Sequence, residues 1–376
     1  MVESVCRNNH PCAARWTLHH AVPAFFKAGN LIISNSPIVS FIVAFIPFFL
    51  FSILLLNCTP QQNGPVSKTD FMMGTYVSIT CHDYDVEEAQ INSAIEAAFA
   101  AIKKIEAKTN PYDERSLISV INRGKDEHRV VKLDSQLADL AGQAIDIAQK
   151  SGATFDFTLW PVFRLWNFDT DSAQIPSMEV IATALNHVDY RKVKLDSLSL
   201  LIDAGVEIDF NGISKGYAVE TARKVLLAKG LKNFIIDAGG NLGIEWEKSQ
   251  PMLVIVRHPR KDGVFWGEFP ISKSCGIATS GDYHFYFMSD GRRYHHLLNP
   301  ETGYPAENAV STTIIAPTAT LADGFSTAVF VMGIDAGKAF ITANPDLEGL
   351  IIYQDTDSLQ TYLSPALTES FKFSQP

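Results

Sequence analysis

Asp323 and Thr327 stand four residues apart in an apolar stretch that reads TLADGFSTAVFVMG. A spacing of four places both side chains on one face of a helix. A carboxylate buried in such a segment needs a partner or a metal. Completed by backbone carbonyls and ligand phosphates, a carboxylate and a hydroxyl suit Mg²⁺, which prefers oxygen ligands. The alternative is a structural aspartate that caps a helix or pairs with an arginine.

Two adjacent histidines, His295 and His296, precede the turn sequence NPETG. We expect them at the end of a strand, where alternation sends neighbouring side chains to opposite faces. Only one of them can therefore face a site. A histidine titrates near neutral pH and is the usual general base there. A strand histidine with satisfied hydrogen bonds is the alternative for either residue.

The segment IDFNGISKGY, residues 208–217, predicts a strand, a turn and the start of a helix. It places Gly212, Lys215 and Gly216 at the N-terminus of that helix. Free backbone N–H groups and the helix dipole at such a position favour a phosphate. The P-loop pattern GxxxxGK[ST] is absent, so an ordinary turn remains the alternative.

Hydrophobic periodicity predicts the elements that position these residues. Apolar residues at helical spacing indicate long helices, and alternating segments indicate strands, most of them in the second half of the chain. This pattern predicts one α+β domain with mixed and antiparallel sheets and flanking helices. The aromatic stretch 153–168 is interrupted by Pro161 and is expected to be a buried loop. We predict helices at 86–107, 135–150, 214–229, 318–332 and 335–343, and strands at 71–80, 130–134, 207–210, 233–237 and 350–353, with a hairpin over 187–203.

Composition excludes several classes of protein. An apolar content of 47% with 19% charged residues indicates a globular chain with a sizeable core. A net charge of −10 argues against non-specific nucleic-acid binding. The cysteines form no CxxC motif and have no histidine at ligand spacing, which argues against a zinc or redox centre. Cys81 and Cys275 are expected as unpaired core cysteines, with a disulfide in an exported protein as the alternative.

The N-terminal region predicts a membrane segment. Residues 38–56 carry no charge and are long enough to cross a bilayer, and the preceding basic residues favour a cytoplasmic N-terminus. Cys58 directly follows, as in a lipoprotein signal; an uncleaved anchor is the alternative. We therefore expect a signal or membrane segment over 1–57, a polar tether over 58–69 and a functional domain over 70–376. Both alternatives hold the domain outside the cytoplasm.

Several motifs follow one another between residues 72 and 333: MMGT, PYDERSLISVIN, the FD of GATFDFT, DFNGISKGYAVE, DAGGNLG, ATSGDY, HHLLNPETGYP and TLADGFSTAVFVMG. In type and order they resemble the ApbE family, the FAD:protein FMN transferases. The resemblance implies a T-fold-related domain, FAD as substrate, Mg²⁺ as cofactor and a lipoprotein on the periplasmic side of the inner membrane. It also implies transfer of FMN from FAD to a Ser/Thr of a membrane redox subunit, of the NADH:quinone or ferredoxin-type oxidoreductases, with release of AMP.

The resemblance also implies roles for individual residues. Gly212, through its carbonyl, and the side chains of Asp323 and Thr327 would hold Mg²⁺. His296 would be the base for the acceptor hydroxyl, and Leu297 would lie against the flavin. The residues implied to hold FAD are Met73, Tyr112, Thr154, Phe155, Asp156, Asp209 and Lys215.

Three positions depart from the pattern of the family. Asn211 and Ser214 replace the first glycine and the alanine of the usual GGIAKG, and neither removes a metal side chain. Asn299 replaces the aspartate of the turn, but Asn-Pro is itself a good turn former. Two alternatives to transfer stay open: Mg²⁺-dependent hydrolysis of FAD to FMN and AMP, and FAD binding by a lipoprotein without turnover.

Overall fold

The computed structural model describes residues 64–168 and 172–374. The predicted segment 1–57, Cys58 and the first half of the predicted tether lie outside these residues. The first strand, β1 (Val66–Met72), already begins within 58–69. One described helix, α8 (Ala319–Ala343), is long and apolar enough to cross a membrane, but more than half of its apolar window is buried inside the domain. It is a core helix.

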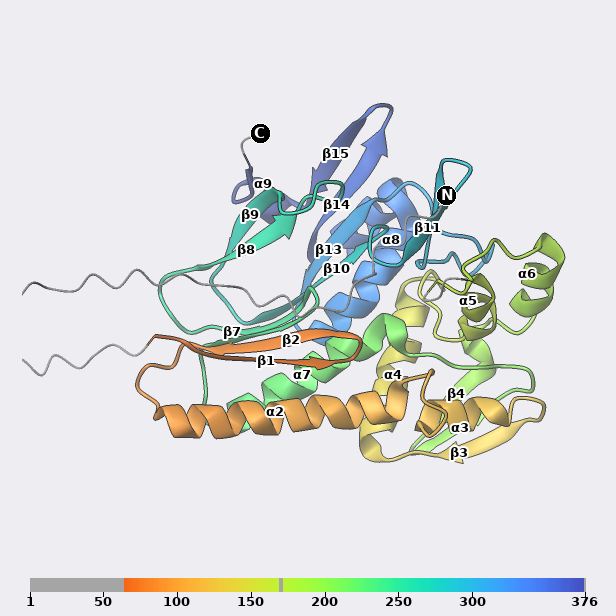
Figure 1. Cartoon of the computed structure of the whole chain (residues 1–376), viewed down its shortest axis with the longest axis horizontal. Helices are drawn as coiled ribbons and strands as arrows, with labels where there is room; N and C mark the ends of the chain where they lie inside the picture. The colour runs from red at the N-terminus through yellow and green to blue at the C-terminus, as the bar shows by residue number, and fades with distance from the viewer. Residues whose placement is uncertain (1–63, 169–171, 375–376) are drawn as a thin grey trace, which may run out of the picture. The chain divides into compact units, whose positions relative to one another are not determined.

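An antiparallel sheet of eight strands forms the centre of the domain, as Figure 1 shows. Every neighbouring pair in it is antiparallel. The strands adjoining β1 follow in the order β2 (Thr75–Cys81), β6 (Phe234–Ala238), β7 (Asn241–Glu245), β10 (Cys275–Gly281), β13 (Ser311–Ala316), β14 (Glu348–Asp355) and β15 (Ser358–Leu363).

Three smaller sheets complete the strands of the described chain. The hairpin of β11 (Tyr286–Ser289) and β12 (Arg292–His295) leads directly into His296. The other two sheets have the orders β16 (Lys372–Phe373), β9 (Phe265–Ile271), β8 (Met252–Arg257) and β3 (Arg129–Lys132), β5 (Ser199–Ile202), β4 (Val193–Asp196). The predicted α+β domain with antiparallel sheets and flanking helices is confirmed.

Helices pack against the central sheet and against one another. The apolar spacing of α2 (Glu88–Thr109) buries Ile91, Ile95, Ile102 and Ile105, as the periodicity predicts. The next helix inward, α7 (Asn211–Ala228), contacts α2, α8 and strands β6 and β7, and Figure 1 shows it between α2 and the strands. Residues 216–220 of α7 are therefore all buried. The remaining helices are α3 (Leu117–Arg123), α4 (Ser135–Lys150), α5 (Trp160–Trp166), α6 (Met178–Leu185), α9 (Pro365–Thr368) and the 3₁₀ turn Tyr190–Lys192.

The structure corrects three local predictions. Residues 71–80 form two strands, because the chain turns at Met73 and Gly74, both with positive φ. Residues 207–210 form no strand, because the side-chain amide of Asn122 hydrogen-bonds the N–H and C=O of Ile208 in place of a neighbouring strand. Part of the expected aromatic loop is helix α5, in which Pro161 sits in the first turn, where proline is tolerated.

Two other predictions are confirmed. Gly333 has φ 72° and interrupts α8, which separates the two helices expected at 318–332 and 335–343. Cys81 and Cys275 are both buried and free, so the disulfide alternative is wrong. Burial raises the pKa of each thiol to about 12, which keeps both protonated and unreactive.

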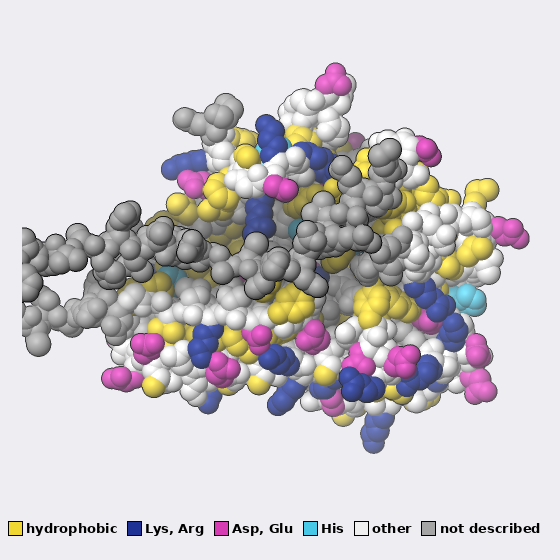
Figure 2. Space-filling model, in the orientation of Figure 1, with side chains coloured by type: hydrophobic (Ala, Val, Ile, Leu, Met, Phe, Trp, Pro, Cys, Tyr) yellow, Lys and Arg dark blue, Asp and Glu magenta, His cyan; other side chains and the backbone are white. Residues whose placement is uncertain are grey.

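Charged side chains of both signs lie on the face of the domain that Figure 2 shows. On the face that Figure 2 shows, basic and acidic side chains are interspersed along the edge formed by α2 and its neighbours. Exposed pairs such as Lys68–Glu96 and Lys103–Asp70 join the two charges there.

Candidate active site

Asp323 lies in the second turn of α8 and is 5% exposed. Its Oδ2 accepts a hydrogen bond of 2.8 Å from the backbone N–H of Gly216 in α7. Burial raises the pKa of Asp323 to about 6, against the opposing effects of the Lys215 charge and this hydrogen bond. Within the described chain no arginine pairs with Asp323, so its partner is the backbone of the glycine–lysine segment.

Gly212, Phe155 and Thr327 lie against one another beside Asp323. A Cβ atom placed on Gly212 would lie 2.9 Å from a ring carbon of Phe155 and 3.8 Å from the methyl of Thr327. A side chain at position 212 would press on the Phe155 ring, so a glycine suits this place in the first turn of α7. The hydroxyl of Thr327 is 3.4 Å from that of Ser280 in the ATSGD segment. Ser280 was not singled out from the sequence; its place in a small polar run at a strand end was the available signal.

Lys215 is the cation shared by this cluster. Its charge lowers the pKa of Asp209 and Asp323, and it also lowers the pKa of His296. Burial dominates at Asp209 and raises its pKa to about 7, although Asp209 Oδ1 accepts a 2.9 Å hydrogen bond from the N–H of Asn211. No hydrogen bond or ion pair joins the Lys215 ammonium to the residues that the structure describes. That ammonium is available to an anionic ligand.

The two histidines have different roles. His295 is buried, its Nε2 lies 3.0 Å from the carbonyl of Ala306, and its Nδ1 accepts from the N–H of Leu297. Burial lowers its pKa to about 4. His295 is therefore a structural strand histidine whose two ring nitrogens both have partners, and it holds the turn that follows.

His296 is the histidine with free hydrogen-bonding capacity. Its Nδ1 is buried, and no described residue hydrogen-bonds it. Burial lowers the pKa of His296 to about 3, with further lowering by His295, Lys215 and His284. The ring is therefore neutral at physiological pH and can accept a proton. Phe285 packs edge-on against it, with 5.5 Å between ring centroids.

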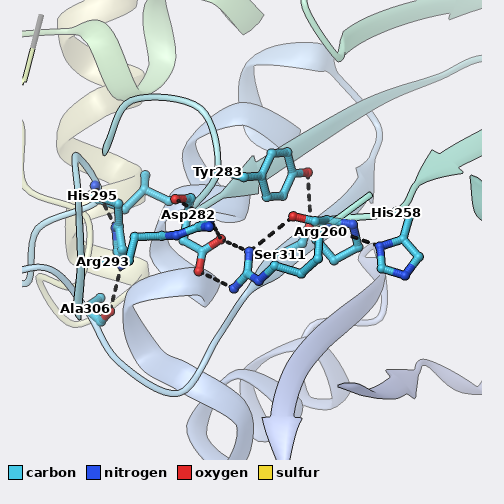
Figure 3. Close-up of polar contacts among 10 residues, drawn as sticks. His258, Arg260, Asp282, Tyr283, Arg293, His295, Ala306 and Ser311 are labelled. Carbon is cyan, nitrogen blue, oxygen red and sulfur yellow. Dashed lines mark hydrogen bonds and ion pairs between the residues drawn. The ribbon is translucent and has the colours of Figure 1, made fainter. Parts of the chain in front are cut away.

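A carboxylate fixes the hairpin that carries His296. Asp282 is 7% exposed and accepts two hydrogen bonds of 2.6 Å from Arg260. Arg293 of β12 approaches the same carboxylate at 3.4 Å, and Figure 3 shows Asp282 between the two guanidinium groups. Asp282 follows Ser280 closely in the sequence, so a single segment contacts Thr327 on one side and the hairpin on the other.

The other residues expected to hold FAD lie in four separate segments. Met73 lies in the β1–β2 turn and donates its N–H to Glu106, and Tyr112 packs edge-on against Trp160 before α3. The hydroxyl of Thr154 donates to the carbonyl of Ser151. Leu297 is buried directly after His296. Four segments distant in sequence thus meet here, and they supply Phe155, then Asp209, Gly212 and Lys215, then His296, and finally Asp323 and Thr327.

Asp156 has a different set of contacts. Its Oδ1 accepts from both the N–H and the hydroxyl of Thr158, and its Oδ2 accepts from the N–H of Tyr190. Burial raises its pKa, and these bonds oppose the shift. Both carboxylate oxygens are engaged in holding the Phe155 turn to the segment at Tyr190. In this structure Asp156 fixes the turn that presents Phe155.

Asn299 forms the turn that its sequence predicts. Its side-chain Oδ1 accepts a 2.8 Å hydrogen bond from the N–H of Glu301, and its carbonyl accepts from Thr302 and Gly303. An aspartate would accept the same bond, so the substitution keeps the geometry of the turn.

A protein-only metal site is not present in the described part of the chain, where no three His, Cys, Asp or Glu residues gather. The oxygen donors that do meet are one carboxylate, one hydroxyl and the backbone of a glycine, beside an unpaired ammonium. This set can bind a hard cation only together with the oxygens of an anionic ligand. These groups define a class of protein in which a bound anion would lie next to an uncharged histidine.

Comparison with known proteins identifies the family. Residues 73–351 match the sequence model of the ApbE family, and the chain belongs to that family. A relative from Treponema pallidum, named FAD:protein FMN transferase, is 29% identical over 308 residues, covering 77% of this chain and 84% of the relative. A relative of the same name from Escherichia coli K12 is 30% identical, covering 61% of this chain and 68% of the relative. The relatives are transferases, so the family is one of enzymes.

Solved structures agree with this assignment. The ApbE protein of Thermotoga maritima is 34% identical and superposes with a TM-score of 0.73, over 82% of this chain and 99% of that protein. The apo flavinyl transferase ApbE of Pseudomonas stutzeri has a TM-score of 0.72 over 83% of this chain and 98% of that protein. At 24% identity the latter shows the shared fold alone.

Proposed function

We propose that this chain is a Mg²⁺-dependent FAD:protein FMN transferase, which attaches FMN from FAD to a Ser or Thr hydroxyl of a membrane redox subunit and releases AMP. The observation that carries the proposal is the position of Lys215, whose charge acts on Asp209, Asp323 and His296 at once. A phosphate-binding cation, the metal side chain and a neutral base therefore share one site. The shared name of the relatives supports the same reaction.

The residues present fit a magnesium ion. Asp323 uses only Oδ2 for its hydrogen bond to Gly216, which leaves Oδ1 for a ligand. The carbonyl of Gly212, in the first turn of α7, and the hydroxyl of Thr327, one helical turn after Asp323, are the other two oxygen groups. We expect these three groups to hold Mg²⁺. When bound, the ion supplies neutralisation of pyrophosphate charge.

Positioning of FAD falls to groups around this centre. The Lys215 ammonium and the N-terminus of α7 would bind the pyrophosphate, as helix N-termini do for anions. Phe155, which packs against Gly212, and Leu297, which follows His296 in the chain, would lie against the flavin. Asp209 accepts from the backbone of α7 and keeps Asn211 in place. Such positioning is most of what phosphoryl transfer asks of a protein.

His296 supplies proton transfer in this proposal. A ring nitrogen takes the proton of the acceptor hydroxyl as its oxygen bonds to the FMN phosphorus. The bond from that phosphorus to the bridging oxygen breaks, and its electron pair leaves on AMP. Burial keeps the imidazole unprotonated at neutral pH. A positioned base contributes roughly 10²–10⁴-fold to such a step.

The test uses the purified protein with FAD and Mg²⁺, with and without a candidate redox subunit. We expect the subunit to gain one FMN, measured by mass spectrometry, with one AMP released per FMN attached. Equal rates of FMN and AMP release without the subunit would instead show FAD hydrolysis. Bound yellow FAD with no AMP formed would show a flavin-binding protein without turnover. Either result would contradict the proposal.

We also propose that the domain is anchored at the periplasmic side of the inner membrane, through a lipid on Cys58 or through residues 38–56. Labelling cells with radioactive palmitate separates the two anchors. We expect label on the wild type and none on Cys58→Ala. An unlabelled wild-type protein that keeps its N-terminal peptide in the membrane fraction would establish the uncleaved anchor instead.

A further inference from the structure

Two hydrogen bonds join α7 to the first turns of α8. The carboxylate of Glu220 accepts from the N–H of Ala319 at 3.3 Å. One turn earlier in α7, the N–H of Gly216 donates to Asp323 at 2.8 Å. The bonded residues are four apart in each helix, so the pair of bonds fixes the register of one helix on the other.

Close packing at the same crossing leaves α8 little freedom to slide. A Cβ on Gly216 would lie 2.3 Å from the carbonyl oxygen of Ala319 and 2.5 Å from the Cβ of Asp323. On the other side, a Cβ on Gly276 of β10 would lie 2.2 Å from the nitrogen of Ala319. Ala319 is thus held between two glycines. Since Asp323 follows it by one turn, the position of Ala319 sets the position of the metal side chain.

The charge of Glu220 is well placed to hold this helix end. The first N–H groups of a helix have no partner within the helix, and the dipole favours a negative charge beside them. Glu220 is 4% exposed, and Arg223 offsets the cost of burying it with hydrogen bonds of 2.8 and 3.2 Å. Arg223 also pairs with Glu245, which accepts from the hydroxyl of Ser274. Glu245 makes no bond to α8.

We propose that Glu220 is a positioning residue for the metal site: it holds the N-terminus of α8 in the register that presents Asp323 to the cation. The functional part rests on the proposed Mg²⁺-dependent reaction. Glu220 touches neither the cation nor FAD. Its effect reaches the site through Ala319 and the first turn of α8.

The pair Glu220→Gln and Glu245→Gln tests this role. Each removes one carboxylate from Arg223, but only the first weakens the bond to Ala319. We expect Glu220→Gln to raise the Mg²⁺ concentration for half-maximal flavin transfer about tenfold, since a charged acceptor bonds about twice as strongly as a neutral one. The rate at saturating Mg²⁺ should change less than threefold. Glu245→Gln should lower the melting temperature and leave the Mg²⁺ requirement unchanged.

Amide hydrogen exchange of the metal-free proteins gives a second readout that needs no flavin chemistry. We expect faster exchange over residues 319–323 in Glu220→Gln than in Glu245→Gln or the wild type. Equal exchange in the two variants, or equal Mg²⁺ requirements, would overturn the positioning role. A wild type without Mg²⁺-dependent transfer would refute the proposed function instead, and the exchange data would still decide whether Glu220 holds α8.

Discussion

The two halves of the candidate site are built in different ways. The half proposed to hold Mg²⁺, called the metal half below, contains Asp323 and lies where two long helices, α7 and α8, cross inside the core. Asp323 and Glu220 there each bond to the backbone of the facing helix. The base half lies at the end of the two-stranded β11–β12 hairpin, which stands apart from the eight-stranded sheet. Its neighbours Phe285 and Met288 are half-exposed.

This difference separates two ways of holding a reactive group. A helix crossing fixed by glycines tolerates no added atom, because every shift is opposed by packed backbone. The hairpin is instead held through Arg293 of β12, which shares the carboxylate of Asp282 with Arg260. We therefore expect variants of the metal half to change metal affinity and stability together, and variants of the base half to change mainly the catalytic rate.

The largest effect is expected from Asp323→Ala. It removes the carboxylate of the proposed metal site, and loss of a metal that stabilises phosphoryl charge costs several kcal/mol, or roughly 10³–10⁵-fold in rate. Flavin transfer, measured by the mass of the acceptor, should fall below detection. Full activity of this variant at ordinary Mg²⁺ concentrations would remove Asp323 from the site.

Asp323→Asn tests whether loss of activity at this position comes from unfolding, because this substitution should make the metal-free protein more stable. The pKa of Asp323 is about 6 in the folded chain and 3.8 as its ordinary value, so the buried charge destabilises the metal-free protein above pH 6. This cost disappears as the pH falls below 4. The neutral amide keeps an acceptor for Gly216 and should therefore stabilise the metal-free protein at pH 7.5 by about 1–3 kcal/mol. Chemical denaturation measures this gain; a destabilised Asp323→Asn protein would contradict it.

His296→Gln should lower the rate of transfer by roughly 10²–10⁴-fold, the usual contribution of a general base. The Mg²⁺ requirement and FAD binding should stay near those of the wild type, because the ring is bonded to no residue of the metal half. Rate and FAD titrations in parallel check both statements. His295→Gln is the control, and it should lower the stability of the protein because it removes the bond to Ala306. A larger loss of rate in His295→Gln than in His296→Gln would make His295 the general base.

Low pH should raise the Mg²⁺ requirement. Below pH 6 a proton competes with the cation for Asp323, so the Mg²⁺ concentration for half-maximal activity should rise about tenfold per pH unit. The pKa of His296 is about 3, so the base stays unprotonated over this range. Mg²⁺ titrations between pH 5 and 8 measure the effect. A different result would be a Mg²⁺ requirement that does not vary with pH together with a transfer rate that falls below about pH 6.5. That result would assign the pH dependence to His296 and not to Asp323.

Asp282→Asn tests how the hairpin is held. The substitution removes the negative charge that pairs with Arg260 and Arg293 and so weakens the attachment of β12. We expect the rate at saturating substrate to fall about tenfold, because small misplacements of a catalytic group are costly. The Mg²⁺ requirement should be unchanged. Asp290→Asn, at the tip of the same hairpin, is a matched control. A changed Mg²⁺ requirement in Asp282→Asn would show that the hairpin and the metal half do not act independently.

The smallest effect is expected from Asn299→Asp. The turn accepts from Glu301 through Oδ1 in either case, so the rate should stay within about threefold of the wild type. Steady-state rates of both proteins give the answer. A gain of tenfold or more would mean that a carboxylate at this position assists His296 beyond its place in the turn.

The local parts of this protein were predictable from sequence. The isoleucine spacing of residues 91–105 gave α2, and the four-residue spacing of Asp323 and Thr327 gave their common helix face. The motif order gave the family, which the match over residues 73–351 confirms. Local prediction failed at 207–210, where an amide side chain of Asn122, distant in sequence, takes the place of a strand.

The sequence alone determined which residue types were available and on which faces they lie, because periodicity is a property of neighbouring residues. Only the tertiary structure decided that His296 has a free nitrogen, that Asp156 has none of its oxygens free, and that Glu220 meets Ala319. These outcomes depend on burial and on hydrogen bonds between separate segments, 34 residues apart for Asp156 and Tyr190 and 99 apart for Glu220 and Ala319, which no local pattern encodes. The helix crossing at Gly216 shows both contributions. The sequence shows that position 216 is a glycine, and the tertiary structure shows why: the backbone of α8 leaves no room for a Cβ atom there.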